Sequence, residues 1–293
     1  MSDAINLRTL EAFYWVARLG GFGRAAEKLH TTQPAVSARI AQMEAAFDVR
    51  LLERDRRRRV TLTPKGIEML AQAERMLALR GEMVALLSSP TQLGGTVRLG
   101  VSESIVHLWL AELVQRLHAE HPRITLDISV DVSQRLRDGV LAGEMDVGIV
   151  LGPVAAPQVV NLPLGEVALA WVASPNLPMR DGPLDLAALA AWPILTYARA
   201  TRPYRQVADL FATTAGTRLF ANSSLSSIVR MAVDGIGIGA IPPAVIGREL
   251  ADGSLVLLDA LPRLDPLVYE AVYLDGPGNT LAAAVARMTH AIA

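Results

Sequence analysis

The stretch GRAAEKLHTTQPAVSARIAQME, residues 23–44, decides the fold of the first part of the chain. Its two halves each have a helical pattern, and His30 and Thr31 separate them. Thr32 is a good N-cap for the second helix, and Pro34 suits its first turn, where a backbone N–H has no partner. The second helix should bury Val36, Ile40 and Met43. The pattern predicts a helix-turn-helix with small and polar residues on its outward face, which suits a helix that enters the DNA major groove.

The flanking sequence predicts a third helix and a wing. Asn6 can cap a helix over residues 7–19, which would pack behind the helix-turn-helix. Short strands at residues 51–52 and 60–62 enclose Arg54 and Arg56–Arg59. Arginine binds phosphate and narrow minor grooves well, so this tip is a candidate DNA contact, although a solvated charged turn has the same composition.

A long helix is expected next. Thr63 can cap it, Pro64 fits its first turn, and its pattern runs to about Ser88. An apolar seam repeats every seven residues and would suit a partner helix, or a surface of its own domain. This candidate dimerisation seam consists of Leu70, Leu77 and Val84. The segment SSPTQLGG, residues 88–95, has the composition of a hinge.

These motifs resemble the LysR-type transcriptional regulators. The likeness rests on AA, L and QPAVS within the opening stretch, on LLER at residues 51–54, on the arginine-rich turn and on LTPKG at residues 62–66. It is close over about residues 5–66, and farther on it rests on length and strand–helix pattern. Two departures are Gly23 for a common Ser and Ala38–Arg39 for a common Arg–Gln pair.

The resemblance implies an oligomeric DNA-binding regulator that responds to a small organic effector. The long helix that begins at Pro64 would be a linker helix, which pairs antiparallel with that of a second subunit in a homodimer or a homotetramer. We expect base-edge contacts from Gln33, Pro34 and Ser37, and contacts to phosphate or the minor groove from Arg39 and Arg57. Promoter DNA is the expected macromolecular partner, and RNA polymerase is a further candidate.

Composition and charge narrow the class of protein. The chain has 293 residues and no cysteine, which excludes disulfides and thiol chemistry. It shows no apolar run of membrane-spanning length and no signal-peptide pattern, so a cytoplasmic protein without a membrane partner is expected. Residues 1–80 hold 14 Lys and Arg against 9 Asp and Glu, whereas the remainder holds 14 against 20. A basic head on an acidic body fits DNA binding by the head alone, although chance composition could also give it.

From residue 95 strands alternate with helices, among them one expected over residues 105–120 and one over residues 133–142. This pattern predicts two mostly parallel α/β lobes joined by two crossovers. This fold class is an N-terminal winged helix-turn-helix with a long linker helix, followed by a C-terminal bilobed domain like that of periplasmic binding proteins. The expected divisions are a DNA-binding domain at 1–63, a linker helix at 64–89, a hinge at 90–94, and an effector-binding regulatory domain at 95–293, with lobe I at 95–163 and 267–293 and lobe II at 164–266.

Ligands of open α/β sheets bind beyond the carboxyl ends of strands, near helix N-termini. Polar residues at those positions are therefore candidate effector contacts, and they suggest an anionic organic effector. The candidates are Ser102, Ser104, Ser133, Tyr197, Arg202 and Asn222. Each serine could instead be an ordinary helix cap, and Arg202 could be a surface arginine.

Enzymatic function finds little support. The five histidines show no zinc-ligand spacing, so no metal site and no cofactor are expected. GIGIG, residues 235–239, opens a strand rather than following one, which disfavours a dinucleotide loop. No nucleophile motif stands out, so the protein is not expected to be an enzyme. The alternative to a regulator is a cytoplasmic solute-binding or sensor protein whose N-terminal helices only oligomerise.

Overall fold

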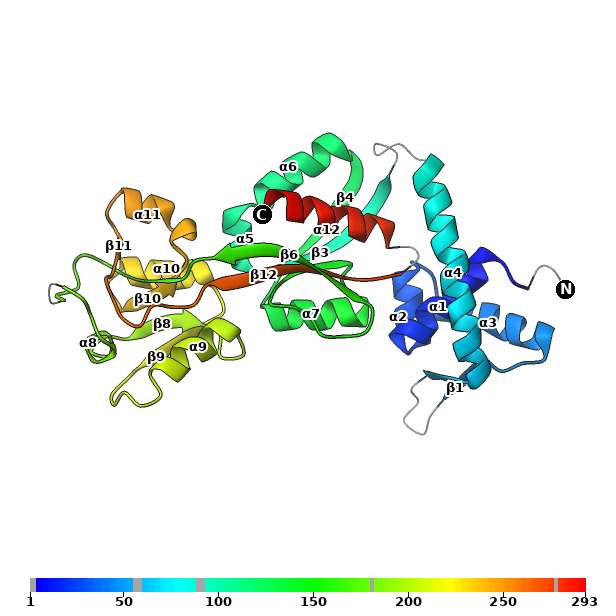
Figure 1. Cartoon of the computed structure of the whole chain (residues 1–293), viewed down its shortest axis with the longest axis horizontal. Helices are drawn as coiled ribbons and strands as arrows, with labels where there is room; N and C mark the ends of the chain where they lie inside the picture. The colour runs from blue at the N-terminus through cyan, green and yellow to red at the C-terminus, as the bar shows by residue number, and fades with distance from the viewer. Residues whose placement is uncertain (1–3, 55–59, 88–92, 180–181, 277–278) are drawn as a thin grey trace.

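The computed structural model describes residues 4–54, 60–87, 93–179, 182–276 and 279–293. Figure 1 shows an elongated molecule with a helical head at one end and two α/β lobes in a row beyond it. The head carries the chain start, and the C-terminal helix returns to the middle lobe. The layout agrees with the predicted fold class.

The head contains the expected helix-turn-helix. Its elements are α1 (Leu7–Leu19), α2 (Phe22–Lys28), α3 (Gln33–Phe47), β1 (Leu52–Arg54) and β2 (Val60–Leu62). The predicted caps are present, because the Thr9 amide donates to the Asn6 side chain at 2.9 Å and the Ala35 amide donates to the Thr32 hydroxyl at 3.4 Å. The predicted stripe of α3 is fully buried, which confirms the helical period.

Two side chains fix the wing against the head. Glu44, near the end of α3, accepts hydrogen bonds from the amides of Leu51 and Leu52 at 2.7 and 3.1 Å. Thr63 donates to the Arg50 carbonyl and accepts from the Gly66 amide. A Cβ at position 66 would collide with the Leu51 carbonyl, so glycine is required by this close approach.

The linker helix α4 (Pro64–Leu87) corrects one prediction. Leu70 and Leu77 do not form an open seam, since they are buried in the head core of the same chain. The cause is α1, which packs against α4 and shares one buried cluster with Leu70 and Leu77 (Figure 1). The side chain of Val84 lies outside the described residues.

Lobe I is built on a mixed sheet of strand order β4-β3-β5-β12-β6. The strands are β3 (Gly94–Val101), β4 (Arg123–Val130), β5 (Val147–Leu151), β6 (Val159–Val167) and β12 (Leu267–Leu274). Strand β3 is parallel to β4 and β5, whereas β12 is antiparallel to β5 and β6. The expectation of a mostly parallel sheet therefore holds for only part of it.

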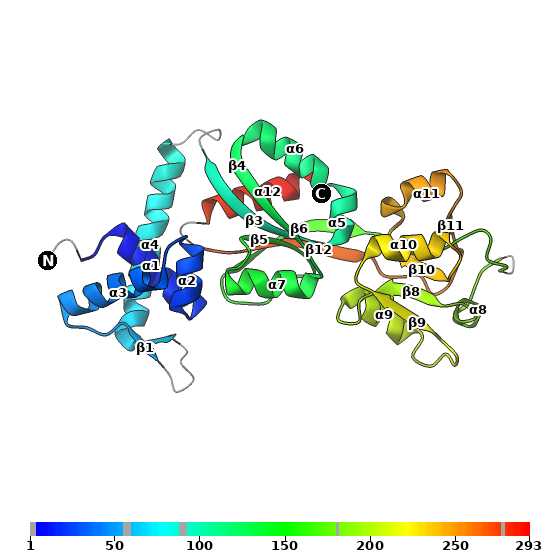
Figure 2. The same cartoon turned by 180° about the vertical axis from the view of Figure 1, so that it is seen from behind.

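Helices cover both faces of this sheet. They are α5 (Glu103–Leu108), α6 (Leu110–Glu120), α7 (Ser133–Ala142) and α12 (Thr280–Ile292). Figures 1 and 2 show α7 on one face and α6 with α12 on the other. Residues of β12 alternate accordingly: Val272 packs with Leu136 of α7, whereas Ala271 belongs to the cluster on the opposite face.

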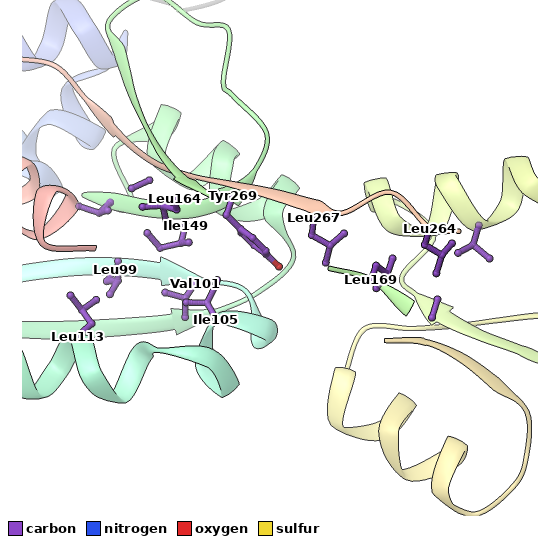
Figure 3. Close-up of a cluster of buried hydrophobic side chains, with 14 of the residues drawn as sticks. Leu99, Val101, Ile105, Leu113, Ile149, Leu164, Leu169, Leu264, Leu267 and Tyr269 are labelled. Carbon is purple, nitrogen blue, oxygen red and sulfur yellow. The ribbon is translucent and has the colours of Figure 1, made fainter. Parts of the chain in front are cut away.

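Lobe II has a second mixed sheet of strand order β11-β7-β10-β8-β9. Its strands are β7 (Ala170–Ala173), β8 (Ile194–Tyr197), β9 (Leu219–Asn222), β10 (Ile238–Ile241) and β11 (Val256–Leu257). Its helices are α8 (Leu186–Ala190), α9 (Arg202–Leu210), α10 (Leu225–Val233) and α11 (Gly247–Ala251), with a 3₁₀ turn at Pro243–Val245. Figure 3 shows Leu169, Leu264 and Leu267 where the chain crosses between the lobes.

Several elements differ from the sequence-based prediction. The helix expected from residue 105 to 120 is two helices, because Trp109 has a non-helical backbone at φ −143°. Strand β6 was not predicted, since its exposed pattern lacks the apolar run of a central strand. Helix α9 begins at Arg202, so Arg202 and Tyr204 lie in the first turn of a helix.

Candidate functional site

The second helix of the helix-turn-helix presents an exposed face. Gln33 and Pro34 are exposed at its start, while Ser37 and Arg39 are half-buried. Arg57 lies outside the described residues. Gln42 is also exposed on α3, and the helical period alone could have identified it. Gln33, Ser37 and Gln42 are thus hydrogen-bonding side chains of α3 that remain accessible, with Gln33 and Gln42 at the two edges of the exposed face.

A cavity of about 290 Å³ lies between the lobes, at the carboxyl ends of β3, β4 and β8. It brings together four predicted effector residues, namely Ser102, Ser104, Ser133 and Tyr197. Tyr269 from β12 lines the same cavity, and Figure 3 shows its hydroxyl directed away from the lobe I core toward the region between the lobes.

Hydroxyl groups dominate this cavity. Ser102 donates to the Tyr269 hydroxyl at 3.4 Å, and Ser133 accepts from the Leu151 amide at 3.1 Å. The Tyr197 hydroxyl is buried beside Ser104, but it forms no hydrogen bond of normal geometry with any described residue. Burial raises the pKa of Tyr197 and of Tyr269, so both phenols are neutral near pH 7 and can donate a hydrogen bond.

The other two predicted effector residues do not line this cavity. Arg202 lines a neighbouring hollow of about 640 Å³, together with Arg137, Arg199 and Arg205. Asn222 accepts from the Ser224 amide at 2.9 Å, because its side chain turns back onto the start of α10. Ser223 and Leu225 take its place in the cavity wall.

Glu103 joins the two lobes, a role that the sequence did not predict. From α5 in lobe I its carboxylate accepts hydrogen bonds from the amides of Leu225 and Ser226 at 2.5 and 3.0 Å, and from the Ser226 hydroxyl at 2.7 Å. Burial alone would raise the pKa of Glu103, but these hydrogen bonds outweigh it and lower the pKa. The positive end of α10 is thus already occupied by an internal anion.

Asp146 joins the head to lobe I in a similar way. Its carboxylate lies 2.5 Å from Lys28 Nζ in α2 and 2.9 Å from Arg98 Nη2 in β3. Burial would raise the pKa of Asp146, but the hydrogen bonds of Arg98 and the charge of Lys28 lower it to about 2. Burial in turn lowers the pKa of Lys28, against the pull of Asp146. Lys28 Nζ also lies 4.9 Å from the centre of the Trp15 ring.

Two classes of site are missing from the part of the chain that the structure describes. No group of three or more His, Asp or Glu side chains there could hold a metal ion. None of the helices described is long and apolar enough to cross a membrane.

A helix-turn-helix head joined to a two-lobed body with a cleft between the lobes is the architecture of a ligand-responsive transcription regulator. Comparison with known proteins agrees. Residues 7–67 match the model for bacterial regulatory helix-turn-helix proteins of the lysR family, and residues 90–290 match that for the LysR substrate binding domain. The second match covers more than half of the chain, so the chain belongs to the LysR family. It is a DNA-binding transcriptional regulator with an effector-binding domain.

Individual relatives agree with this assignment. The chain is 28% identical over 270 residues to the uncharacterised HTH-type transcriptional regulator YeiE of Escherichia coli K12, covering 89% of this chain and 88% of that protein. A full-length OxyR variant of Pseudomonas aeruginosa aligns with 98% of this chain and 94% of its own length, at a TM-score of 0.66 and 22% identity. Vibrio fischeri DarR, solved with DNA, aligns at a TM-score of 0.57 and 21% identity over 99% of both chains. The two structures support the fold.

Proposed function

We propose that a small organic effector binds between the lobes and changes how the paired heads engage promoter DNA. The observation that carries this proposal is the interlobe cavity, where hydroxyls from both lobes converge and the Tyr197 hydroxyl lacks a partner among the described residues. A buried hydroxyl without a partner is costly, so a ligand group that completes it is stabilised there. In this proposal residues 1–63 are the DNA-binding domain, 64–89 the linker helix, 90–94 the hinge and 95–293 the effector-binding domain.

Helix α7 offers a path from the cleft to the head. Its first residue, Ser133, lines the cavity. Just after its other end, the Gly143 carbonyl accepts from Arg98, which also binds Asp146. Because Asp146 contacts Lys28 of the head, a shift of α7 caused by a ligand would reach α2 directly.

The DNA contacts are proposed for Gln33, Pro34 and Ser37 at base edges, with Arg39 and Arg57 at the backbone or minor groove. Losing one base contact should weaken binding of the cognate site by about 1–3 kcal/mol and relax preference at one position. Losing Arg57 should weaken cognate and random DNA alike. Gel-shift titrations with the protein's own upstream DNA test this, and parent-like binding by both Ser37→Arg and Arg57→Ala would refute the assignment.

We propose that α4 mediates a homodimer through a different face from the one predicted. Met76, Leu79 and Met83 are 50%, 58% and 57% exposed and share one side of the helix. Exposed apolar residues at this spacing suit a second copy of the helix. Sedimentation of the full chain measures the assembly and distinguishes a dimer from a tetramer.

A matched pair of variants separates assembly from head stability. Leu79→Glu should lower the sedimenting mass while leaving the unfolding midpoint of the head near that of the parent. Leu77→Glu should instead destabilise the head by several kcal/mol, of order 3, because it buries an unpaired charge within the same chain. If Leu79→Glu keeps the parent mass, the dimer face lies elsewhere.

The effector site is tested by blocking the cleft. Thermal-shift screening of small organic acids and amino acids against the full chain should find stabilising compounds, since a ligand that binds only the folded state raises its stability. Ser133→Trp should abolish those shifts. Thr125→Trp, on the exposed amino-terminal half of β4, is the matched control and should retain them. Equal shifts for both variants would place the ligand outside the cleft.

We further propose that the protein has no catalytic activity and works in the cytoplasm, where promoter DNA and RNA polymerase are found. Family membership supports a regulator over the alternative of a solute-binding protein with merely oligomerising helices. A DNA-binding head with an exposed recognition helix is not needed by that alternative.

A further inference from the structure

The cleft is divided into two regions of opposite charge. The smaller cavity is lined by the carboxylates of Glu103 and Asp131, and no lysine or arginine of the described chain lines it. The neighbouring hollow, the arginine hollow, is lined by Arg137, Arg199, Arg202 and Arg205 and by a single acidic residue, Asp138. The two regions share Ser133, Leu151 and Thr201 in their walls, so they are adjacent.

The arginines are largely free to bind a ligand. Among the described residues, neither Arg202 nor Arg205 takes part in an ion pair, and Arg199 donates only to the Tyr204 hydroxyl at 3.1 Å. Arg202 reaches from lobe II to lobe I. Its guanidinium lies so close to Gly152 of lobe I that a Cβ at that position would be 3.1 Å from Arg202 Nη1. A ligand anion held there would therefore contact both lobes.

Each region also holds a buried polar atom without a partner. The Tyr197 hydroxyl lines the carboxylate-lined cavity, and the Arg137 Nε lies at the arginine hollow. Within the described part of the chain neither atom has a hydrogen bond. Leaving such groups unpaired costs free energy, so both regions are prepared for a hydrogen-bonding ligand rather than for an apolar one.

An anion is disfavoured in the smaller cavity. Its natural anchor would be the start of α10, but Glu103 already accepts the Leu225 and Ser226 amides. Asp131 adds a second carboxylate, which is offset only by Arg135, itself 77% exposed. Like charges brought together in a cleft repel each other, so an ammonium or a neutral donor fits this region and a carboxylate does not.

We propose that the effector is dipolar, with an anionic group at Arg137 and Arg202 and an ammonium group facing Glu103 and Asp131. This assignment rests on the proposed function of the cleft as the effector site, and it changes the ligand class expected from the sequence. A purely anionic effector would satisfy only the arginine hollow. A dipolar effector satisfies both regions and couples lobe I to lobe II through charge.

The test uses three probe series of matched length, from about three to eight carbons. The first is ω-amino acids, the second dicarboxylates and the third diamines. Isothermal titration of the full-length chain should show at least one amino acid binding about tenfold more tightly than the dicarboxylate and the diamine of the same length. A preference for dicarboxylates, equal binding of all three classes, or no binding by any amino acid would overturn the dipolar assignment.

Variants locate the two charged ends. Arg202→Gln should weaken the amino acid and the dicarboxylate about tenfold but not the diamine. Asp131→Asn should weaken the diamine and the amino acid and improve the dicarboxylate. Arg230→Gln removes an exposed arginine of α10 that pairs with Asp234 outside the cleft, and it should leave all affinities unchanged. An amino acid that binds Arg202→Gln and Asp131→Asn as tightly as the parent would overturn the assignment.

Failure of the cleft itself is distinguishable from failure of the ligand class. If Ser133→Trp retains binding of every probe, the cleft is not the effector site and the proposed function fails with it. If Ser133→Trp abolishes binding but dicarboxylates bind the parent best, only the dipolar assignment fails. Fluorescence anisotropy measures promoter-DNA binding by each variant, and retained binding confirms that the head remains folded.

Discussion

Two carboxylates of lobe I contact the neighbouring parts of the molecule, Asp146 the head and Glu103 lobe II, and their partners differ. Asp146 faces Lys28 of the head and Arg98 of its own lobe, and its side chain is 12% exposed. Glu103 accepts hydrogen bonds from amides and hydroxyls at the start of α10 in lobe II, its side chain is 25% exposed, and its nearest basic group is His107 of its own helix at 3.9 Å. The first contact is a buried ion pair, whereas the second is a partly solvated helix cap.

The difference indicates which joint can move. Breaking a buried ion pair leaves an uncompensated charge and is expensive. Releasing a carboxylate from a helix N-terminus returns it to nearby water, and such contacts are worth only tenths of a kcal/mol to about 1 kcal/mol. We therefore expect the head to stay attached to lobe I while the two lobes change their angle.

The largest effect is expected from the head contact. Asp146→Asn leaves Lys28 and Arg98 buried without their counter-charge, so it should lower the free energy of unfolding by about 3 kcal/mol. Urea denaturation of the parent and the variant measures the change.

Asp127→Asn is the matched control, because Asp127 is exposed on β4 of the same lobe. It should change stability by no more than about 0.5 kcal/mol. Equal stabilities of the Asp146 and Asp127 variants would show that the ion pair contributes nothing and that the comparison is wrong.

A pH series sharpens the same point with a somewhat smaller effect. Asp146 has a folded-state pKa of about 2 against an ordinary value of 3.8, which is a depressed pKa. Its contribution is therefore present above about pH 4 and is lost as the pH falls through 2. By linkage it amounts to about 2 kcal/mol.

The measurement is the stability difference between the parent and Asp146→Asn at several pH values. The difference should be constant from about pH 7 to 5 and should shrink steadily below pH 4. A difference that persists unchanged at pH 2.5 would mean that the variant acts through packing and not through charge.

The smallest effect is expected at the lobe contact. Glu103→Gln should lower stability by only about 0.5 kcal/mol, because the carboxylate is partly exposed and screened. It should nevertheless alter the response of DNA binding to an effector, measured by fluorescence anisotropy with promoter DNA. A loss as large as that of Asp146→Asn would contradict the assignment of this joint as the mobile one.

The sequence predicted the local features well, for physical reasons. The caps at Asn6 and Thr32, the buried stripe of α3 and the bounds of α7 follow from short-range rules, and the structure confirms them. Four cleft residues were also predicted, because strand ends and helix starts mark them. The seam of α4 could not be assigned to its own chain, since the repeat of Leu70 and Leu77 does not reveal which helix fills it.

Contacts between distant segments escaped prediction. Glu103 and Leu225 are 122 residues apart in the chain, and Lys28 and Asp146 are 118 apart. Nothing in the local sequence pattern distinguishes the side chains of Glu103, Lys28 and Asp146 from ordinary solvated charges. Arg137 and Arg205 escaped for the same reason, because only the packed lobes bring them to one hollow.

Hydrogen exchange measured by mass spectrometry tests the central claim, that the lobe contact opens while the head contact stays closed. The amides of Leu225 and Ser226 lie in the first turn of α10 and depend on Glu103. The Arg98 amide donates at 2.9 Å to the Asp146 carboxylate, which also binds Lys28 of the head, so it reports whether that carboxylate keeps its place. We predict that the α10 amides exchange about tenfold faster than the Arg98 amide, and that Glu103→Gln accelerates only them. Equal exchange of both contacts, or acceleration of Arg98 by Glu103→Gln, would contradict the account.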